Sequence, residues 1–323
     1  MSSRPLFFLF VDGLGLGPDA SANLMSTRAL PGFRAWTGGA PWTLQGTRTP
    51  ENRDGTRVFR GIDATLGVSG LPQSGTGQST LFTGTNCAAL MGRHYGPWPP
   101  TVTHPLLDSE SLFHRAMELA AGDVLFANAY PDAFFERNGR TGRWSTTTRA
   151  ARAAGLSLCS LRDLAAGRAL AADITGRGLS AFSGAPHPVT EQLAAERLAG
   201  LVAAHSLVVF EYFHTDKAGH TASRERLIPV LDSFDEFLLA LYQVWPERAT
   251  LVVTSDHGNA EDIGVKTHTR NPVPLLVYGP LAHHFEGVES LTGVMPAMLQ
   301  AIEDATNRDQ SRGLSSLSRR SAL

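Results

Sequence analysis

Short apolar runs alternate with amphipathic helical patterns along most of this chain. Five of the runs are typical of buried strands, at residues 6–11, 123–128, 206–212, 251–254 and 275–278. Helical patterns lie between or after them, at residues 111–121, 189–204, 227–245 and 292–304. Strands that alternate with helices are connected most readily as a parallel sheet with helices on both faces. The sequence therefore predicts an α/β fold with a three-layer core and a mostly parallel sheet.

The run at residues 251–254 ends in Asp256, His257 and Gly258. In an open α/β sheet, ligands bind at the carboxyl ends of the strands. A carboxylate oxygen beside an imidazole nitrogen at that edge is a natural pair of ligands for Zn²⁺ or Mn²⁺. The same pair of residues also occurs at ordinary strand ends as a turn and a helix cap, so this segment alone leaves both interpretations open.

Two other strands end in the same kinds of residue. The first run leads directly into Asp12 and Gly13, where a simple turn between strand and helix is the alternative interpretation. The run at 206–212 leads to Asp216 and His220, which are four residues apart and share a face if this segment forms a helical turn. An aspartate and a histidine at this spacing, after a strand, indicate a second pair of metal ligands.

The segment 70–84 is rich in glycine and small hydroxyl residues, and a helix is predicted to begin near Gln78. Backbone amides at a helix N-terminus attract anions, and a hydroxyl there, such as Ser74, can attack phosphorus or coordinate a metal. The segment lacks the Gly-Lys-Ser/Thr of a P-loop. A plain Gly-Ser loop with a helix cap is the alternative. A weaker strand is predicted just before this segment, at residues 64–68.

The candidate residues share one placement in the predicted fold. Six of them lie just beyond predicted strands, and His268 lies in a loop that returns to the same edge; the six are Asp12, Ser74, Asp216, His220, Asp256 and His257. Residues of an unrelated core would scatter over both edges of the sheet. Three acids, three histidines and one hydroxyl suit a site for two divalent metal ions about 4 Å apart.

Composition excludes several other classes of protein. The chain has 323 residues and a net charge of −2, so we expect neither nucleic-acid binding nor binding to a membrane surface. The apolar run at 6–11 is too short to span a bilayer and lacks a cleavage site. Cys87 and Cys159 form no disulfide framework, which predicts a cytoplasmic protein.

The middle of the chain has a looser pattern. Residues 129–185 are basic and partly helical, and we predict that they form a small inserted cap on a metal-binding catalytic core made of residues 1–128 and 186–306. Most of the arginines there are interpreted as solvated surface residues. Residues 307–323 are rich in Ser and Arg and are predicted to be a mobile tail.

Five motifs together resemble a known family. They are Val11-Asp12-Gly13-Leu14-Gly15, Gly70-Leu71-Pro72 ahead of Ser74-Gly75-Thr76-Gly77, Asp216-Lys217-Ala218-Gly219-His220, Thr254-Ser255-Asp256-His257-Gly258-Asn259-Ala260-Glu261, and His268-Thr269-Arg270-Asn271-Pro272-Val273-Pro274. Their order and spacing are similar to those of the alkaline phosphatase superfamily, in the branch of cofactor-independent phosphoglycerate mutase and phosphopentomutase. The pattern of sulfatases, Cys/Ser-x-Pro-x-Arg, is absent.

This resemblance implies specific roles. Asp216, His220 and His268 would hold one metal ion, and Asp12, Asp256 and His257 the other, with Ser74 bridging metal and substrate as the nucleophile. The implied cofactors are two divalent ions, Mn²⁺ or Zn²⁺, and the implied substrate is a small-molecule phosphate ester. Candidates for contacts with the substrate are Thr76, Lys217, Lys266 and Arg270.

The chain also departs from the family. Gln78 stands where these mutases usually have a histidine, and residues 129–185 carry none of their cap motifs. Three interpretations stay open: a metal-dependent phosphatase that works through a phosphoserine, a phosphomutase, and a metal-binding pseudoenzyme. The short insertion favours hydrolysis, because a mutase must shield its intermediate from water. The oligomeric state is left undetermined by the sequence.

Overall fold

Six strands form one mixed sheet within the part of the chain that the structure describes. This computed structural model describes residues 4–48 and 55–320, with side chains as far as Arg308. The strand order is β2-β8-β7-β1-β6-β3. β1 pairs in parallel with β6 and β7, and β3 with β6, whereas β8 is antiparallel to β7 and β2. The bounds are Leu6–Val11 (β1), Arg57–Ile62 (β2), Val124–Phe126 (β3), Leu207–Tyr212 (β6), Thr250–Thr254 (β7) and Val273–Tyr278 (β8). The predicted mostly parallel sheet is confirmed.

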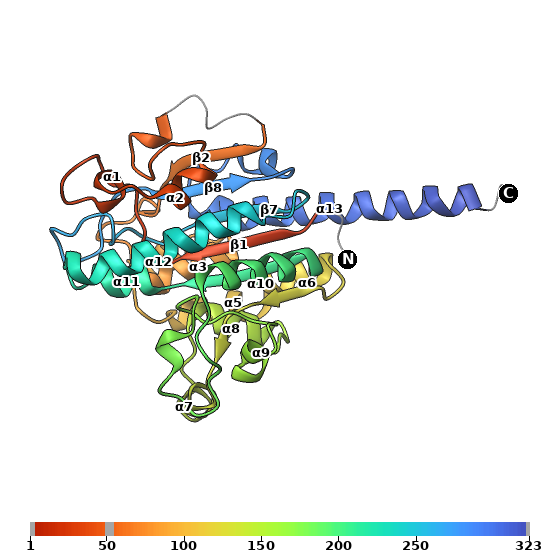
Figure 1. Ribbon diagram of the computed structural model, residues 1–323, viewed down its shortest axis with the longest axis horizontal. Helices are drawn as coiled ribbons and strands as arrows, with labels where there is room; N and C mark the ends of the chain where they lie inside the picture. The colour runs from red at the N-terminus through yellow and green to blue at the C-terminus, as the bar shows by residue number, and fades with distance from the viewer. Residues whose placement is uncertain (1–3, 49–54, 321–323) are drawn as a thin grey trace.

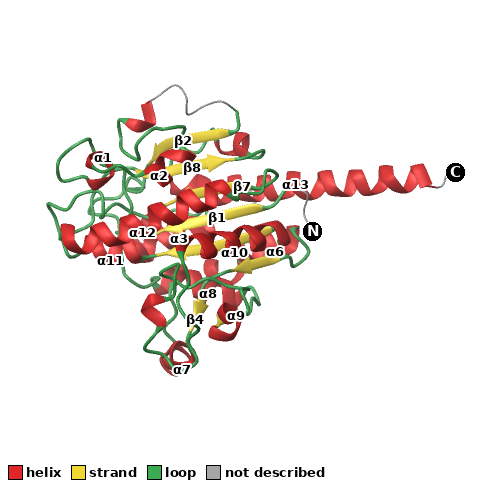
Figure 2. Cartoon of the chain, in the orientation of Figure 1, coloured by secondary structure: helices red, strands yellow, loops and turns green. Residues whose placement is uncertain are grey.

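Helices cover both faces of this sheet, as Figures 1 and 2 show. Successive strand residues point to opposite faces, so Phe7 and Leu9 pack into one apolar cluster and Phe8 and Phe10 into another. The first cluster includes residues of α2 (Pro31–Trp36), α10 (Glu191–Ala204) and α12 (Arg224–Gln243). The second includes residues of α3 (Ser74–Thr83), α5 (His104–Ser109), α6 (Leu112–Leu119) and α13 (Leu291–Arg320). The predicted three layers are therefore present.

Two local predictions were wrong. Residues 64–68 form turns rather than a strand, because the Asp63 carboxylate accepts hydrogen bonds from the amides of Thr65 and Leu66 and bends the chain there. The strand of this region is β2, which ends one residue before Asp63. The helix expected near Gln78 begins at Ser74. The helix begins there despite the glycines at positions 75 and 77. The backbone at Gly75 packs directly against the carbonyls of Tyr95 and Trp98, which supports the first turn.

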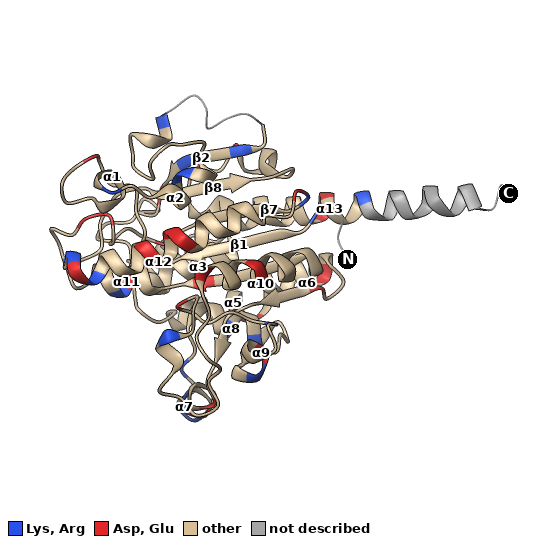
Figure 3. Cartoon of the chain, in the orientation of Figure 1, with Lys and Arg blue, Asp and Glu red and all other residues tan. Residues whose placement is uncertain are grey.

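Residues 129–185 contain short elements with a small apolar cluster of their own. The elements are β4 (Ala129–Tyr130), α7 (Asp132–Thr141), α8 (Thr146–Ala153), β5 (Cys159–Ser160), α9 (Leu161–Ala165) and a 3₁₀ turn, η4 (Arg177–Leu179). Ala150 and Ala151 of α8 pack into the core of the main sheet instead. Figure 3 colours the Lys and Arg positions of this part of the cartoon blue. Two of the arginines have acidic partners: Arg149 pairs with Asp108 and Arg177 with Glu191. Whether this segment works as a cap stays a prediction.

The C-terminal helix is longer than predicted. α13 starts at Leu291 and continues to Arg320, beyond the expected end at Asp304, and projects from the body of the molecule in Figure 1. The mobility of residues 307–323 stays a prediction. Cys87 and Cys159 are free thiols, and both are buried. Among the described residues, we find no helix with both the length and the apolar character that crossing a membrane requires.

Candidate metal centre

The carboxyl ends of three parallel strands bring the predicted residues to one rim of the sheet. Asp12 directly follows β1, and Asp256 lies two residues after β7. β6 leads into α11 (His214–Gly219), which carries Asp216, and His220 is its C-terminal cap. Because β8 runs antiparallel to β7, the loop before it reaches the same rim and delivers His268 there.

Four of these residues form a buried group, here called the inner cluster: Ser74, Asp12, Asp256 and His257. The Nε2 atom of His257 lies 3.0 Å from Ser74 Oγ, 3.4 Å from Asp12 Oδ1 and 3.5 Å from Asp256 Oδ2. His257 and Asp256 are completely buried, and Asp12 and Ser74 are each 8% exposed. Two carboxylates and a hydroxyl therefore converge on one imidazole nitrogen.

The other three form the outer cluster: Asp216, His220 and His268. His220 Nε2 lies 3.3 Å from Asp216 Oδ2, and His268 Nε2 lies 3.6 Å from Asp216 Oδ1. The two Nε2 atoms are 3.2 Å apart. The outer cluster touches the inner one, because the rings of His268 and His257 stack with centroids 3.6 Å apart. The structure thus brings together all seven residues that the sequence singled out.

The hydrogen bonds of the three imidazoles orient their free nitrogens. In each ring Nδ1 faces a backbone carbonyl, which can only accept, so Nδ1 carries the hydrogen and Nε2 of the neutral ring presents a lone pair to the cluster. The three contacts are His268 with Pro72 at 2.7 Å, His220 with Lys266 at 2.9 Å and His257 with Gly258 at 3.4 Å. Lone pairs directed at one another and at carboxylates repel unless a cation lies among them.

The inner acids also behave as ligands that need a cation. Asp12 Oδ1 and Asp256 Oδ2 are buried and have no hydrogen-bond partner among the described residues. Burial, together with the charges of Asp256, Asp216 and Glu211, raises the pKa of Asp12 well above its usual value. Burial and the charge of Asp216 raise the pKa of Asp256 to about 7. A divalent ion offsets both effects, so the donor set fits a metal ion.

The pKa of His257 moves in the opposite direction. Burial, followed by the nearby imidazole of His268, lowers it to about 3. A histidine that resists protonation in this way stays neutral at physiological pH. Neutral imidazole is the form that binds a metal ion.

The backbone around Asp12 is adapted to the close approach of the outer cluster. Gly13 has a φ of +70°, and a Cβ atom there would lie 2.6 Å from the Cβ of Asp216. Its amide donates to Asp256 Oδ1 at 3.3 Å. A larger residue at position 13 would push the two clusters apart, so glycine is required here.

Each cluster has one carboxamide that orients a carboxylate. Gln78 Nε2 donates to Asp12 Oδ2 at 3.2 Å in the inner cluster. Asn259 Nδ2 donates to Asp216 Oδ1 at 2.7 Å in the outer cluster. Gln78, noted in the sequence only as a departure from the family, therefore lies against a candidate ligand. The role of Asn259 was missed, although it follows the Asp-His-Gly segment directly.

Sequence reasoning also missed two buried glutamates. Glu261 accepts hydrogen bonds from the amides of Gly15 at 2.9 Å and Asn259 at 2.7 Å, and from the side chains of Thr269 and Asn271. It therefore joins the loops after β1 and β7 to the loop before β8. Glu211 lies within β6, where burial raises its pKa to about 7. The available signal was an acid inside the apolar run Leu207-Val208-Val209-Phe210-Glu211.

The four residues predicted to contact substrate lie in different environments. Lys217 lies with its ammonium 4.2 Å from the ring centroid of Phe213, and burial lowers its pKa while the charges of Asp12 and Glu211 raise it. Lys266 and Arg270 are exposed. Thr76 is completely buried, and its hydroxyl faces the carbonyls of Gln73 and Tyr95.

A cavity of about 500 Å³ borders the segment before Ser74. Its lining comes from two segments, residues 69–73 and 93–96, and includes Leu71, Gln73, Arg93, His94 and Tyr95. Burial, and to a smaller extent the charge of Arg270, lower the pKa of His94, which lines this cavity. The cavity is large enough for a small organic molecule.

Comparison with known proteins agrees with this geometry. The profile of the Metalloenzyme superfamily matches residues 184–303, which include the whole outer cluster and Asp256 and His257. The 2,3-bisphosphoglycerate-independent phosphoglycerate mutase of Acaryochloris marina is 39% identical over 80 residues, or 23% of this chain and 15% of that protein. The enzyme of the same name from Aliivibrio fischeri is 30% identical over 131 residues, or 38% of this chain and 25% of that protein. The matches thus span a quarter or less of these relatives.

Solved structures resemble the whole fold. Alkaline phosphatase from the Antarctic bacterium TAB5 has a TM-score of 0.53 at 13% identity, over 94% of this chain and 99% of that one. A cold-active alkaline phosphatase from Shewanella has a TM-score of 0.51 at 11% identity, over 91% and 99% of the two chains. The fold and the ligand clusters define a metal-binding α/β protein with an alkaline phosphatase-like sheet. The chain is therefore similar to the Metalloenzyme superfamily over residues 184–303 and to phosphoglycerate mutases over shorter segments, and its fold resembles that of the alkaline phosphatases.

Proposed function

We propose that this chain is a two-metal-dependent phosphoryl-transfer enzyme that hydrolyses a phosphate monoester through a phosphoserine at Ser74. The observation that carries the proposal is the convergence of three imidazole Nε2 lone pairs and three aspartates beside one serine hydroxyl, at distances of 3.0 to 3.6 Å. Such a set of donors is suited to two divalent cations and to little else.

The two clusters divide the ligands between the ions. Asp216, His220 and His268 would hold one ion, and Asp12, Asp256 and His257 the other, with the Ser74 hydroxyl next to the inner ligands. Imidazole and carboxylate donors suit Mn²⁺ or Zn²⁺. When bound, the ions supply positive charge that lowers the pKa of a hydroxyl and offsets the negative charge on the transferring phosphoryl group.

Ser74 occupies a position suited to attack on phosphorus. It is the first residue of α3, a helix of 10 residues, so the amides of the first helical turn and the positive end of the helix favour the anionic phosphoryl oxygens. Ser74 Oγ would form a bond to phosphorus as the bond between phosphorus and the ester oxygen breaks, and the alcohol leaves. Water then cleaves the phosphoserine to release inorganic phosphate and restore the serine.

The rest of the substrate would use the surroundings of the clusters. The cavity beside Gln73 is the proposed place for the alcohol part of the ester. Arg270, Lys266 and Lys217 are the proposed cations for its charged groups, and Thr76 is the alternative nucleophile. A small molecule is the proposed partner, and the cytoplasm the proposed location.

Hydrolysis is favoured over isomerisation by the openness of the outer cluster. The His220 side chain is 45% exposed, so water has direct access to that side of the site. A mutase must keep its phosphoserine away from water until a second hydroxyl of the substrate attacks. Phosphomutase activity is the second candidate, supported by the matches to phosphoglycerate mutases. A pseudoenzyme is disfavoured by the complete set of candidate ligands and the intact serine.

A screen of phosphomonoesters with Mn²⁺ or Zn²⁺ distinguishes these functions. Free phosphate identifies a phosphatase, an isomerised ester identifies a mutase, and the absence of both products with either metal contradicts the proposal. Ser74→Ala should lower turnover by more than about 10³-fold, because the nucleophile is lost, while the metal content per chain stays the same. Ser79→Ala, one turn further along α3, is the matched control and should keep turnover. Retained activity in Ser74→Ala would move the nucleophile to Thr76.

A further inference from the structure

A second group of potential metal ligands lies at the opposite rim of the sheet. After β8 the chain forms η5 (Ala282–Phe285), which carries His283 and His284, and these side chains meet Asp304 of α13. One ligand atom from each of the three residues lies within 4.8 Å of the other two. None of the three residues takes part in the inner or outer cluster.

The register of β8 separates this group from the candidate metal centre. Tyr278, the last residue of β8, pairs with Leu251 near the start of β7, whereas Asp256 follows the end of β7. A strand of six residues is roughly 20 Å long at about 3.3 Å per residue. The two groups of ligands therefore cannot share an ion.

Two facing atoms in this group lack partners. His284 Nε2 and Asp304 Oδ2 are both buried, and neither has a hydrogen-bond partner among the described residues. They lie 3.6 Å apart, which is longer than a hydrogen bond. Ligand atoms about 2.0 to 2.2 Å from a shared tetrahedral zinc ion are separated by roughly 3.4 Å. The observed spacing is close to that of two ligands of one ion.

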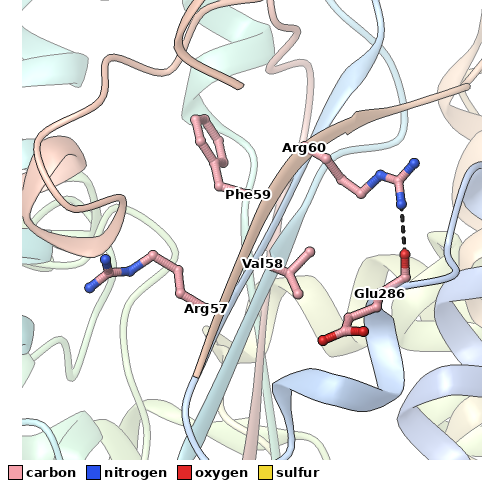
Figure 4. Close-up of a pocket in the computed structure, with 5 residues that line it drawn as sticks. All are labelled: Arg57, Val58, Phe59, Arg60 and Glu286. Carbon is pink, nitrogen blue, oxygen red and sulfur yellow. Dashed lines mark hydrogen bonds between the residues drawn. The ribbon is translucent and has the colours of Figure 1, made fainter. Parts of the chain in front are cut away.

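Neighbouring residues fix the Asp304 carboxylate and the backbone next to η5. Arg308 Nε donates to Asp304 Oδ1 at 2.7 Å, which orients the carboxylate and leaves Oδ2 directed at His284. Arg60 Nη1 donates to the carbonyl of Glu286 at 2.7 Å, a contact drawn in Figure 4 at the edge of a cavity of about 460 Å³. This contact anchors the backbone directly after η5. A hydrogen bond to the second oxygen of a carboxylate, such as the one from Arg308 to Asp304, is typical of metal ligands.

The surroundings of the two facing side chains shift both of their pKa values downward. Burial, followed by the adjacent His283, lowers the pKa of His284, so its imidazole is neutral at neutral pH. The hydrogen bond from Arg308 lowers the pKa of Asp304, so its carboxylate is ionised.

We propose that His283, His284 and Asp304 bind one divalent transition-metal ion, with Zn²⁺ as the best match, at the rim opposite the candidate metal centre. Water completes its coordination on the exposed side, where His283 lies. The ion would link the segment after β8 to α13, near the point where this helix leaves the body. The site is independent of the proposed phosphoryl transfer.

Zinc counting in solution tests this proposal. The full chain and its variants are dialysed against micromolar ZnCl₂, and zinc per chain is measured by mass spectrometry. His284→Ala and the nearly isosteric Asp304→Asn should each bind one zinc ion fewer than the wild type, with phosphatase activity unchanged. His187→Ala removes an exposed histidine elsewhere and should bind as much zinc as the wild type. Equal zinc in all four proteins would overturn the proposal.

Crystals of the wild type soaked in zinc provide a second measurement that does not depend on whether a variant folds. An anomalous difference peak is expected between His284 Nε2 and Asp304 Oδ2, about 2 Å from each. Peaks at the candidate metal centre with none at this position would also overturn the proposal.

Discussion

The inner and outer clusters use the same kinds of side chain in opposite environments. In the inner cluster the side chains of His257 and Asp256 are fully buried, and the pKa of Asp256 is raised to about 7. In the outer cluster the His220 side chain is 45% exposed. Burying like charges costs free energy, which a bound cation or the uptake of a proton offsets. The inner candidate ligands all lie in the protein interior, whereas the outer cluster reaches the solvent through His220 and keeps His268 buried.

Removing one candidate ligand from each cluster should have the largest effect, and it tests whether the two clusters bind their ions separately. Loss of a direct ligand should cost more than about 100-fold in metal affinity, because even an outer hydrogen bond to a ligand is worth 10- to 100-fold. We expect His220→Ala to lose the outer ion and keep the inner one, and Asp256→Asn to lose the inner ion. Both variants should lose turnover. The measurement is Mn²⁺ per chain after dialysis, alongside phosphate release.

Loss of both ions in His220→Ala would contradict separate binding by the two clusters. That result would mean that the two clusters bind metal as a single unit. A histidine far from the site, His114 on α6, is the matched control, and His114→Ala should keep both ions.

The second largest effect is expected in the free energy of unfolding of the metal-free protein, which should respond differently to changes in the two clusters. The folded-state pKa of Asp256 is about 7, against about 3.9 for an unfolded aspartate, so the folded metal-free protein binds this proton more tightly. The free energy of unfolding therefore falls as the pH rises between these two values. Asp256→Asn removes this cost and should stabilise the metal-free protein by at most about 4 kcal/mol at pH 8, and by about 1 to 2 kcal/mol at pH 5.

Urea unfolding in EDTA at the two pH values measures this effect. His220→Ala is the comparison variant, and it should change the free energy of unfolding by about 0.5 kcal/mol or less at both pH values, because its side chain is partly exposed. A destabilised Asp256→Asn at pH 8 would show that the carboxylate is satisfied without a metal ion.

The smallest effect is expected from changing the two carboxamides that donate to candidate ligands, and each change should affect only one cluster. Gln78→Met and Asn259→Ala each remove one hydrogen bond to a candidate ligand, to Asp12 and Asp216 respectively. Each should weaken the ion of its own cluster by 10- to 100-fold, as expected for outer hydrogen bonds. Competitive Mn²⁺ titration measures both affinities. Gln192 is an exposed carboxamide on α10, and Gln192→Ala is the control. If Gln192→Ala weakens metal binding equally, Gln78 and Asn259 do not orient the candidate ligands.

The sheet, and the rim where the seven candidate residues meet, were predictable because both depend on short-range signals. Apolar β-branched runs such as that of β7 mark buried strands, and their abrupt ends in Asp or His mark the rim. The prediction at residues 64–68 failed because it weighed apolar residues and overlooked the Asp63 side chain, which captures two backbone amides. The strand β2, with Arg57 and Arg60 in it, has a weaker apolar pattern.

The supporting residues were not predictable in the same way. Glu261 and Asn259 follow the candidate ligands in the sequence, but their contacts with Gly15 and Asp216 span 246 and 43 residues. His283, His284 and Asp304 are brought together only when α13 packs next to η5. Contacts of this kind depend on tertiary packing, which a single sequence does not encode locally.

The four hydrogen bonds of Glu261 have a consequence for how the site opens. The Glu261 carboxylate is hydrogen-bonded to the loops that carry Asp12, His257 and His268. Movement of one loop would therefore break hydrogen bonds that also hold the other two. We therefore expect local unfolding near the centre to release these three loops together, so that metal binding would order all three at once.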